Sequence, residues 1–296
     1  MTAEFTAGDG TVLKVESQAV NEIVMLSVLG RGALSLVAAN PLEARALGLF
    51  KDTELPWALS LFDLLAVCRT MEFGGQFFDY ARRRAAVIAD GRFHLHDEWD
   101  LLEFYFAGAL DTKDPQFANL NMVTFTGSGR ELERLVLEPS ATVPDSLRRR
   151  IHPKVRILLK YLDGLPDVEA TDAAAFLLGL SDRQLQQLGE SWLQTEEKTK
   201  TDGQFHTISA LPAPGGGGFT ILSGRGTEDE VQRLQVLCLV NKYKHHAPIW
   251  LGIGAVPGGE ATPFVVALDA RQWVPDAELD RLFPVWPLPG TATQTP

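Results

Sequence analysis

The chain of 296 residues is 45% hydrophobic and carries a net charge of −11. This length fits one large or two ordinary domains, and the composition excludes a largely disordered protein because a sizeable core can be buried. The negative charge excludes wholesale attraction to nucleic acid or anionic lipid, so only a local basic patch could bind a polyanion.

The first segment, 1–54, is predicted to be rich in β-structure. Segment 11–15 alternates apolar and polar residues, and segments 23–29 and 33–38 are predicted to form a β-hairpin. A membrane helix over 23–39 is the alternative, but Arg31 would cost about 2.5 kcal/mol or more in hydrocarbon. The hairpin is therefore preferred, and no membrane partner is expected.

The second segment, 55–138, is predicted to be helical. Ser60 and Asp63 have the spacing of a capping box, which places a helix start after Ser60. The apolar stripe expected to be buried on that helix consists of Leu61, Leu64, Leu65 and Cys68. Further helices are predicted over 76–87, 99–110 and 130–137, with a strand over 121–126.

The third segment, 145–285, is predicted to be an α+β domain that follows a linker with two prolines at 138–144. Helix caps are expected at Thr171, Ser181 and Thr227. Strands are expected over 205–211, 219–222, 249–256 and 264–268, which gives a ββαββ-type unit. The tail, 286–296, is Pro-rich, and the whole chain is assigned to the α+β class.

The two cysteines, Cys68 and Cys238, fall inside predicted helices, where a buried thiol is commoner than a disulfide or a metal ligand. We therefore expect a reducing, cytoplasmic setting, no cofactor and no zinc site. The first ten residues, MTAEFTAGDG, lack the basic and apolar regions of a signal peptide.

Apolar and aromatic positions between 55 and 256 resemble a known group of proteins. The stretches that carry the resemblance are SLFDLLAVCRTMEFGGQFFDYARRR, HDEWDLLEFYFAG, HPKVRILLKYLDGLPDVEATDAAAFLLGLSDRQ and NKYKHHAPIWLGIGA. They are similar to the C-terminal, non-nuclease region of uncharacterised prokaryotic proteins that often carry a nuclease-related, restriction-endonuclease-like domain.

The resemblance implies that nuclease chemistry would lie upstream, in an acidic residue followed by Glu-x-Lys on a strand. The Glu-x-Lys of this chain, Glu196-Glu197-Lys198, instead falls at a charged helix end, where a solvated face is expected. A nuclease ancestor of the N-terminus is therefore predicted to be absent or degenerate.

The first candidate site is NKYKHHAPIW, at the end of a predicted helix. It offers cations, two imidazoles that titrate near neutrality and an indole around an anionic ligand: Lys242, Lys244, His245, His246 and Trp250. The alternative is helix capping followed by a β-edge. Adjacent histidines point in different directions, so a shared metal ion is not expected.

The second candidate site is a phosphate-binding patch made from two basic runs. Its members are Arg82, Arg83, Arg84, Arg148, Arg149, Arg150 and Lys154. The alternative is a set of solvated helix faces paired with carboxylates. Two weaker signals are also explained by capping: a metal site at His94 and His96, and a phosphate turn after Ser223 that is crowded by Glu230.

The sequence favours a non-catalytic interaction or regulatory module whose partner is a protein, with nucleic acid possible through the local basic patch. It would recognise that partner through the aromatic helical region or the basic window. The alternative is an enzyme that processes nucleic acid or phosphate esters, with genome defence as one setting, and with a site built from the histidines and arginines. Convergence of those residues in one concave pocket would favour the enzyme.

Overall fold

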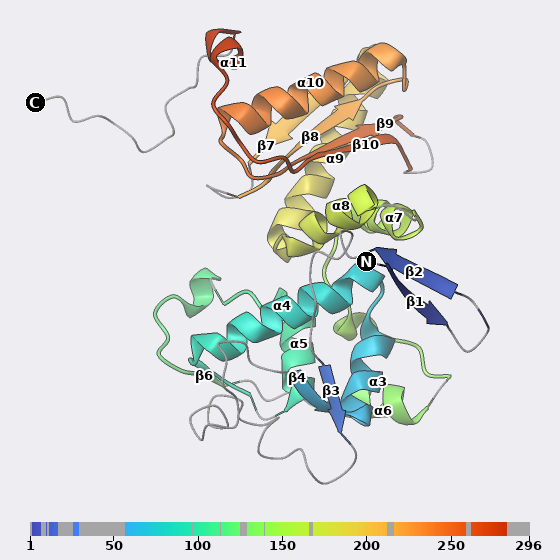
Figure 1. The fold of residues 1–296 in the computed structure, drawn as a ribbon, viewed down its shortest axis with the longest axis vertical. Coiled ribbons are helices and arrows are strands. Elements are labelled where there is room, and N and C mark those ends of the chain that lie inside the picture. The colour runs from blue at the N-terminus through green and yellow to red at the C-terminus, as the bar shows by residue number, and fades with distance from the viewer. Residues whose placement is uncertain are drawn as a thin grey trace, which may run out of the picture. The chain divides into compact units, whose positions relative to one another are not determined.

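The computed structural model describes residues 2–6, 10, 12–16, 26–29, 57–95, 97–112, 114–124, 129–138, 140–165, 168–211, 216–258 and 262–282. It divides into two compact units, Met1–Arg149 and Arg150–Pro296. The predicted α+β class is confirmed, because the described residues form helices together with a mixed four-stranded sheet (Figure 1). The division between the units falls inside the basic window.

The N-terminal unit combines short paired strands with a group of helices. Its strands are β1 (Thr2–Thr6), β2 (Val12–Glu16), β3 (Leu26–Leu29), β4 (Trp57–Ser60), β5 (Phe93–His94) and β6 (Val123–Thr124). Its α-helices are α3 (Leu61–Thr70), α4 (Gly74–Asp90), α5 (Glu98–Gly108) and α6 (Arg130–Leu137), with 3-10 turns at Pro115–Phe117 and Asp145–Leu147. The pair β1–β2 is antiparallel, whereas β3–β4 and β5–β6 are parallel.

The predicted hairpin can be compared with the structure only at its first strand. That strand, β3, lies beside β4 in a parallel register that joins Leu26 to Trp57. The second predicted strand, 33–38, lies outside the described residues. Within the described ranges, no helix is both long and apolar enough to cross a membrane.

Helix α3 starts where the sequence predicts but buries a different face. The capping box is confirmed: Asp63 N donates to Ser60 Oγ at 3.1 Å, and Ser60 N donates to Asp63 Oδ2 at 2.9 Å. The predicted stripe is wrong, since Leu61 and Leu65 are 55% and 40% exposed. The helix buries Ala66, Val67 and Thr70 instead and lies against α5 and α6. Cys68 is exposed, so its predicted burial is also wrong.

The C-terminal unit is a sheet with helices on both faces. Its elements are α7 (Pro153–Asp163), α8 (Val168–Gly179), α9 (Asp182–Asp202), β7 (His206–Ala210), β8 (Gly218–Ser223), α10 (Glu228–Lys244), β9 (Trp250–Ala255), β10 (Pro263–Asp269) and α11 (Ala277–Leu282). The strand order is β10-β9-β8-β7, and β8 and β9 run parallel because α10 connects them. Helix α10 lies on one face of the sheet and α9 on the other (Figure 1).

Helix α10 approaches the sheet closely at Gly252 of β9. A Cβ atom added there would lie 2.6 Å from Cys238 Sγ, so glycine is required by the contact. The capping boxes that start α9 at Ser181 and α10 at Thr227 are confirmed. The cap predicted at Thr171 is wrong, because α8 already begins at Val168.

Candidate functional site

The predicted ligand site at the C-terminal end of α10 is not a single site. Trp250 is fully buried, and its Nε1 donates to Thr220 Oγ1 at 2.9 Å. The His245 ring is stacked on Trp250 with centroids 5.6 Å apart, whereas the His246 ring is stacked on Trp273 at 4.3 Å. The expectation of an exposed indole beside an anion is corrected, since Trp250 belongs to the core beneath α10.

The two predicted lysines differ in burial. Lys244 is half-buried in the last turn of α10, where a cation complements the helix dipole. Lys242 is only 4% exposed. Its Nζ donates to Asp269 Oδ1 at 2.8 Å and to the carbonyl oxygen of Arg271. Lys242 is thus an internal anchor and is not available to an anionic ligand.

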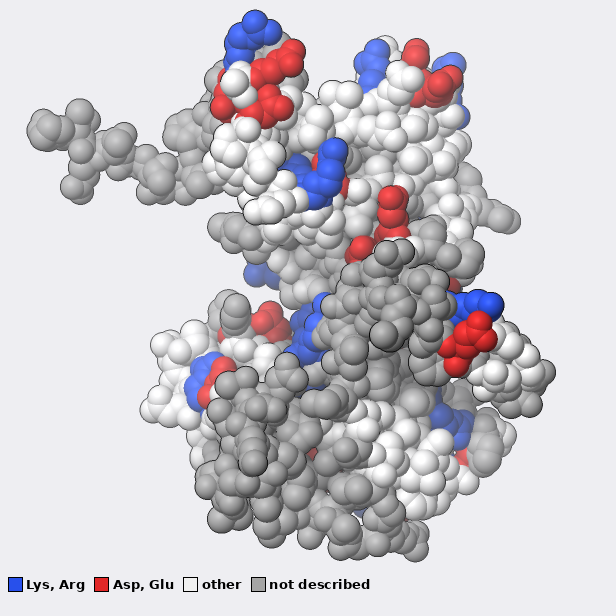
Figure 2. Space-filling model, viewed as in Figure 1, with Lys and Arg blue, Asp and Glu red and all other residues white. Residues whose placement is uncertain are grey.

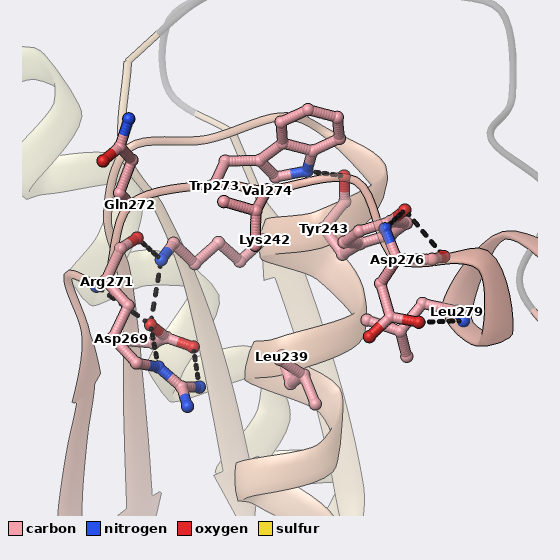
Figure 3. A pocket seen from close by; sticks show the side chains of 10 residues that line it. All are labelled: Leu239, Lys242, Tyr243, Asp269, Arg271, Gln272, Trp273, Val274, Asp276 and Leu279. Carbon is pink, nitrogen blue, oxygen red and sulfur yellow. Dashed lines mark hydrogen bonds and ion pairs between the residues drawn. The ribbon is translucent and has the colours of Figure 1, made fainter.

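Lys242 borders a pocket of about 220 Å³ between α10 and the segment after β10 (Figure 3). On the other side of the pocket, Tyr243 Oη donates to Asp280 Oδ1 at 2.7 Å and accepts from Asp276 N at 2.9 Å. Trp273 Nε1 donates to the carbonyl oxygen of Tyr243 at 3.2 Å. These polar groups form hydrogen bonds with one another. The pocket therefore lies where residues 269–280 are held against α10 by hydrogen bonds.

Removing the Asp269 charge tests this anchor. Hydrogen bonds from Arg271, and then from Lys242, hold the pKa of Asp269 well below its usual range. A carboxyl whose folded pKa is lowered stabilises the fold above its unfolded pKa of about 3.9, and this stabilisation is lost as pH falls toward the folded pKa. We expect Asp269→Asn to cost about 2 kcal/mol at pH 7. Urea unfolding of both proteins should show that this difference shrinks below about pH 4; a difference that stays constant with pH would contradict it.

The predicted phosphate-binding patch is wrong for the arginines that the structure buries. Two of its members, Arg84 and Arg149, are 3% and 2% exposed. The two arginine runs do meet in space, but on a buried carboxylate: Asp79 accepts from Arg83 Nε at 2.8 Å and from Arg149 Nη1 at 3.3 Å. Tyr105 Oη also donates to Asp79, at 2.9 Å. Buried cations of this kind contribute to the fold and cannot bind phosphate from solvent.

A second buried carboxylate completes this network in the N-terminal unit. The Nε–H of Arg84 is shared between the two carboxylate oxygens of Glu98, each at 3.0 Å, and Glu98 Oε1 also accepts from Tyr80 Oη at 2.6 Å. The rings of Tyr80 and Tyr105 meet edge to face at 5.3 Å, which connects the two carboxylate clusters. Burial raises the pKa of both tyrosines, so neither hydroxyl ionises near neutrality.

The remaining basic residues of the predicted patch belong to two units, Met1–Arg149 and Arg150–Pro296, and differ in burial. Lys154 Nζ donates to Glu196 Oε1 at 2.7 Å, beneath the ring of Trp192. Of the predicted solvated residues, Glu197 and Lys198 are exposed, whereas Glu196 is 3% exposed, so the prediction is wrong for Glu196 alone. Arg82 and Arg150 are exposed, and Arg148 is half-buried. On the face drawn in Figure 2, basic and acidic side chains of the described residues lie interspersed in small groups.

The described part of the chain also holds no cluster of side chains for metal binding or nucleophilic chemistry. No group of three histidine, cysteine or carboxylate side chains is placed there to hold a metal ion. The side chains of His94 and His96 lie outside the described residues. Burial raises the pKa of the Cys238 thiol to about 12, so it is not a nucleophile at neutral pH.

The predicted phosphate turn after Ser223 is filled by the protein itself. Glu230 Oε2 accepts backbone hydrogen bonds from Arg225 N at 2.8 Å, Gly226 N at 2.7 Å and Thr227 N at 3.1 Å. These three N–H groups are the donors that an anion would use. Capping of α10 therefore accounts for this turn.

A hollow of about 630 Å³ between α10 and β7 differs from these internal clusters, because its polar side chains Asp229, Gln232 and Arg233 are exposed. It is lined by Phe205, Thr207, Asp229, Gln232, Arg233, Val236 and Leu237. Val236 is 55% and Phe205 41% exposed. Among the described residues, Arg233 and Asp229 have no ion-pair partner, although the Arg233 guanidinium lies 4.9 Å from the Phe205 ring centroid. We name these lining residues the α10–β7 groove.

The groove is open along a strand edge. Of the strands that the structure describes, β7 and β10 are the outer ones of the sheet. Natural edges are usually blunted by bulges, prolines or charges. β10 has such protection, with Pro263 at its start and a register shift between Pro263 and Val265. β7 pairs with β8 in an unbroken register and has the sequence HTISA, without lysine or proline.

Sequence reasoning missed the groove although one signal was present. On α10, a stripe at helical spacing accounts for the face that packs on the sheet and consists of Val231, Leu234, Leu237, Cys238 and Asn241. Val236 lies outside that stripe, and an isolated apolar residue on a solvated helix face can indicate a second contact surface. Arg233 carried no signal by itself, since an exposed arginine on a helix is ordinary.

Comparison with known proteins identifies no relative of this chain. No family model matches the chain, and neither a curated protein nor a solved structure matches it significantly. The α10–β7 groove is therefore interpreted from its own residues.

Proposed function

We propose that this chain is a non-catalytic interaction module whose C-terminal unit binds an extended segment of a partner protein in the α10–β7 groove. The observation that carries the proposal is the outer position of β7 in the described sheet, beside a groove whose exposed Asp229 and Arg233 have no ion-pair partner among the described residues. A segment that adds to a sheet edge gains backbone hydrogen bonds, while alternate side chains enter the neighbouring groove.

The register of β7 supports this mode of binding. Thr207 pairs with Leu222, and paired residues of antiparallel strands point to the same face. Leu222 packs with Leu234 and Cys238 beneath α10, so Thr207 also faces α10. Thr207 is nevertheless exposed, which means that α10 leaves room above the edge strand. A fifth strand would place alternate side chains in that space.

The alternative, an enzyme acting on nucleic acid or phosphate esters, has less support. Its proposed arginines Arg84 and Arg149 are buried against carboxylates, and His245 and His246 turn to different indoles. The resemblance of residues 55–256 to a region that accompanies a nuclease-related domain also agrees with a module that acts beside a catalytic partner.

The proposal is tested by selecting twelve-residue random peptides displayed on phage against the full chain. Affinities of the selected peptides are measured by fluorescence polarisation. We expect Val236→Asp to weaken binding about tenfold or more, because it places a charge among apolar contacts. The matched control is Leu193→Asp on α9, where Leu193 is 41% exposed outside the groove. Circular dichroism verifies that both variants fold.

Three outcomes would overturn the proposal. The first is equal peptide binding by Val236→Asp and wild type. The second is a selection that returns no peptide dependent on the groove. The third is a wild-type dimer, measured by light scattering, that Val236→Asp dissociates, because this would assign the groove to a second copy of the chain.

A further inference from the structure

The side chains that the bound segment should carry follow from the order of the charged and apolar groove residues along α10. Resting on the proposed function, we infer that the segment runs antiparallel to β7 and carries, at every second position in N-to-C order, an apolar residue, a carboxylate and a cation. In one-letter pattern this is Φ-x-[DE]-x-[KR], where Φ is a large apolar residue. The inference uses the order of the groove residues along α10 and their charges.

Helix α10 and strand β7 run in the same direction. Near the start of β7, the Arg233 guanidinium lies 4.9 Å from the Phe205 ring centroid. Further along both elements, Asn241 Nδ2 donates to Ser209 Oγ at 3.1 Å. A strand that joins β7 in the more stable antiparallel arrangement therefore runs opposite to α10.

The spacings of helix and strand agree along the groove. Four residues of a helix rise about 6 Å, and two residues of a strand rise about 6.7 Å. Asp229, Arg233 and Leu237 are four residues apart on α10 and all line the groove. The Arg233–Phe205 and Asn241–Ser209 contacts place Leu237 level with Thr207 of β7 and Arg233 level with Phe205. The first alternate side chain of the segment can thus face Leu237 beside β7, and the next two can face Arg233 and Asp229 where the segment continues past the start of β7 at His206.

Each position of the groove selects a different side chain. The first side chain of the segment faces Leu237 and exposed Val236, which favour an apolar residue. The second faces Arg233, whose guanidinium has no carboxylate partner among the described residues and can bind one with two hydrogen bonds. The third faces Asp229, which favours a cation.

A second copy of the chain is a poor occupant of this groove. One outer strand of such a copy, β7, reads HTISA and contains neither a carboxylate nor a lysine or arginine. The carboxylate of the other outer strand, Asp269 of β10, is already bound by Lys242 and Arg271. Such a copy would leave Arg233 and Asp229 unmatched. The charges of the groove therefore point to a segment of a different protein.

The test is a positional-scanning array of twelve-residue peptides, in which the three alternate positions are varied in a constant threonine and valine background. For the wild-type chain, we expect Asp or Glu at the middle position to bind about tenfold more tightly than Ala. Arg233→Glu should reverse this preference to Lys or Arg, and Asp229→Lys should reverse the preference at the third position. The control, Arg183→Glu on α9, makes the same change in net charge at an exposed arginine outside the groove.

The outcomes separate this inference from the proposed function. Groove-dependent binding without a carboxylate preference overturns the inference and leaves the proposed function intact. A carboxylate preference that survives Arg233→Glu, or that Arg183→Glu also removes, overturns the inference as well. An array in which no peptide binds wild type overturns both.

Discussion

Asp79→Ala is expected to lower the free energy of unfolding of the N-terminal unit by about 3–5 kcal/mol, the range for breaking a buried ion pair. The loss is large because the Arg149 side chain, with 0% relative exposure, keeps its charge after its partner carboxylate is gone. Tyr105 loses its hydrogen-bond acceptor at the same time. Urea unfolding measures the loss, and hydrogen exchange followed by mass spectrometry assigns it to Met1–Arg149.

The matched control for Asp79 lies on the same helix. Asp90 pairs with Arg92 at 2.6 Å, but both side chains are partly exposed, so Asp90→Ala should cost about 1 kcal/mol or less. The double variant Asp79→Leu with Arg149→Met removes both charges and should recover part of the stability lost in Asp79→Ala. If Asp79→Ala costs no more than Asp90→Ala, the buried network does not stabilise the unit.

The second large effect is expected for Trp250→Ala, at about 3–5 kcal/mol in the C-terminal unit. Trp250 is fully buried under α10, and its removal leaves a cavity, while the Thr220 hydroxyl loses the indole donor and keeps its hydrogen bond with Ser209 Oγ at 2.8 Å. Trp250→Phe keeps most of the buried apolar area and loses only the indole hydrogen bond, so it should cost about 1–2 kcal/mol. Urea unfolding followed by circular dichroism measures both. A Trp250→Ala variant as stable as wild type would contradict the role of Trp250 in the core beneath α10.

Features set by neighbouring residues could be predicted from the sequence. The capping boxes at Ser60, Ser181 and Thr227 each require two side chains only three residues apart, and the structure has all three. The strands predicted over 249–256 and 264–268 are present as β9 and β10, which pair antiparallel. In these cases the physical cause lies within a few residues of its effect.

Features set by distant partners could not be predicted. Arg149 is 70 residues from Asp79 in sequence, so its charge was visible but its burial was not. Helix α3 has apolar residues on two sides, and periodicity alone could not decide which side faces α5 and α6. The α10–β7 groove depends on which strand ends up at the edge of the sheet, a property that no single segment encodes.

The unequal edges of the four-stranded sheet limit how it can grow. Of the two outer strands that the structure describes, β10 starts with Pro263, which has no backbone N–H, and its register shifts before Val265, whereas β7 is regular over its whole length, so β7 is the less protected edge. Association through this sheet is therefore expected to saturate at one added segment per chain. A head-to-tail polymer needs two receptive sides on every subunit, and this asymmetry gives the chain protection against fibre formation.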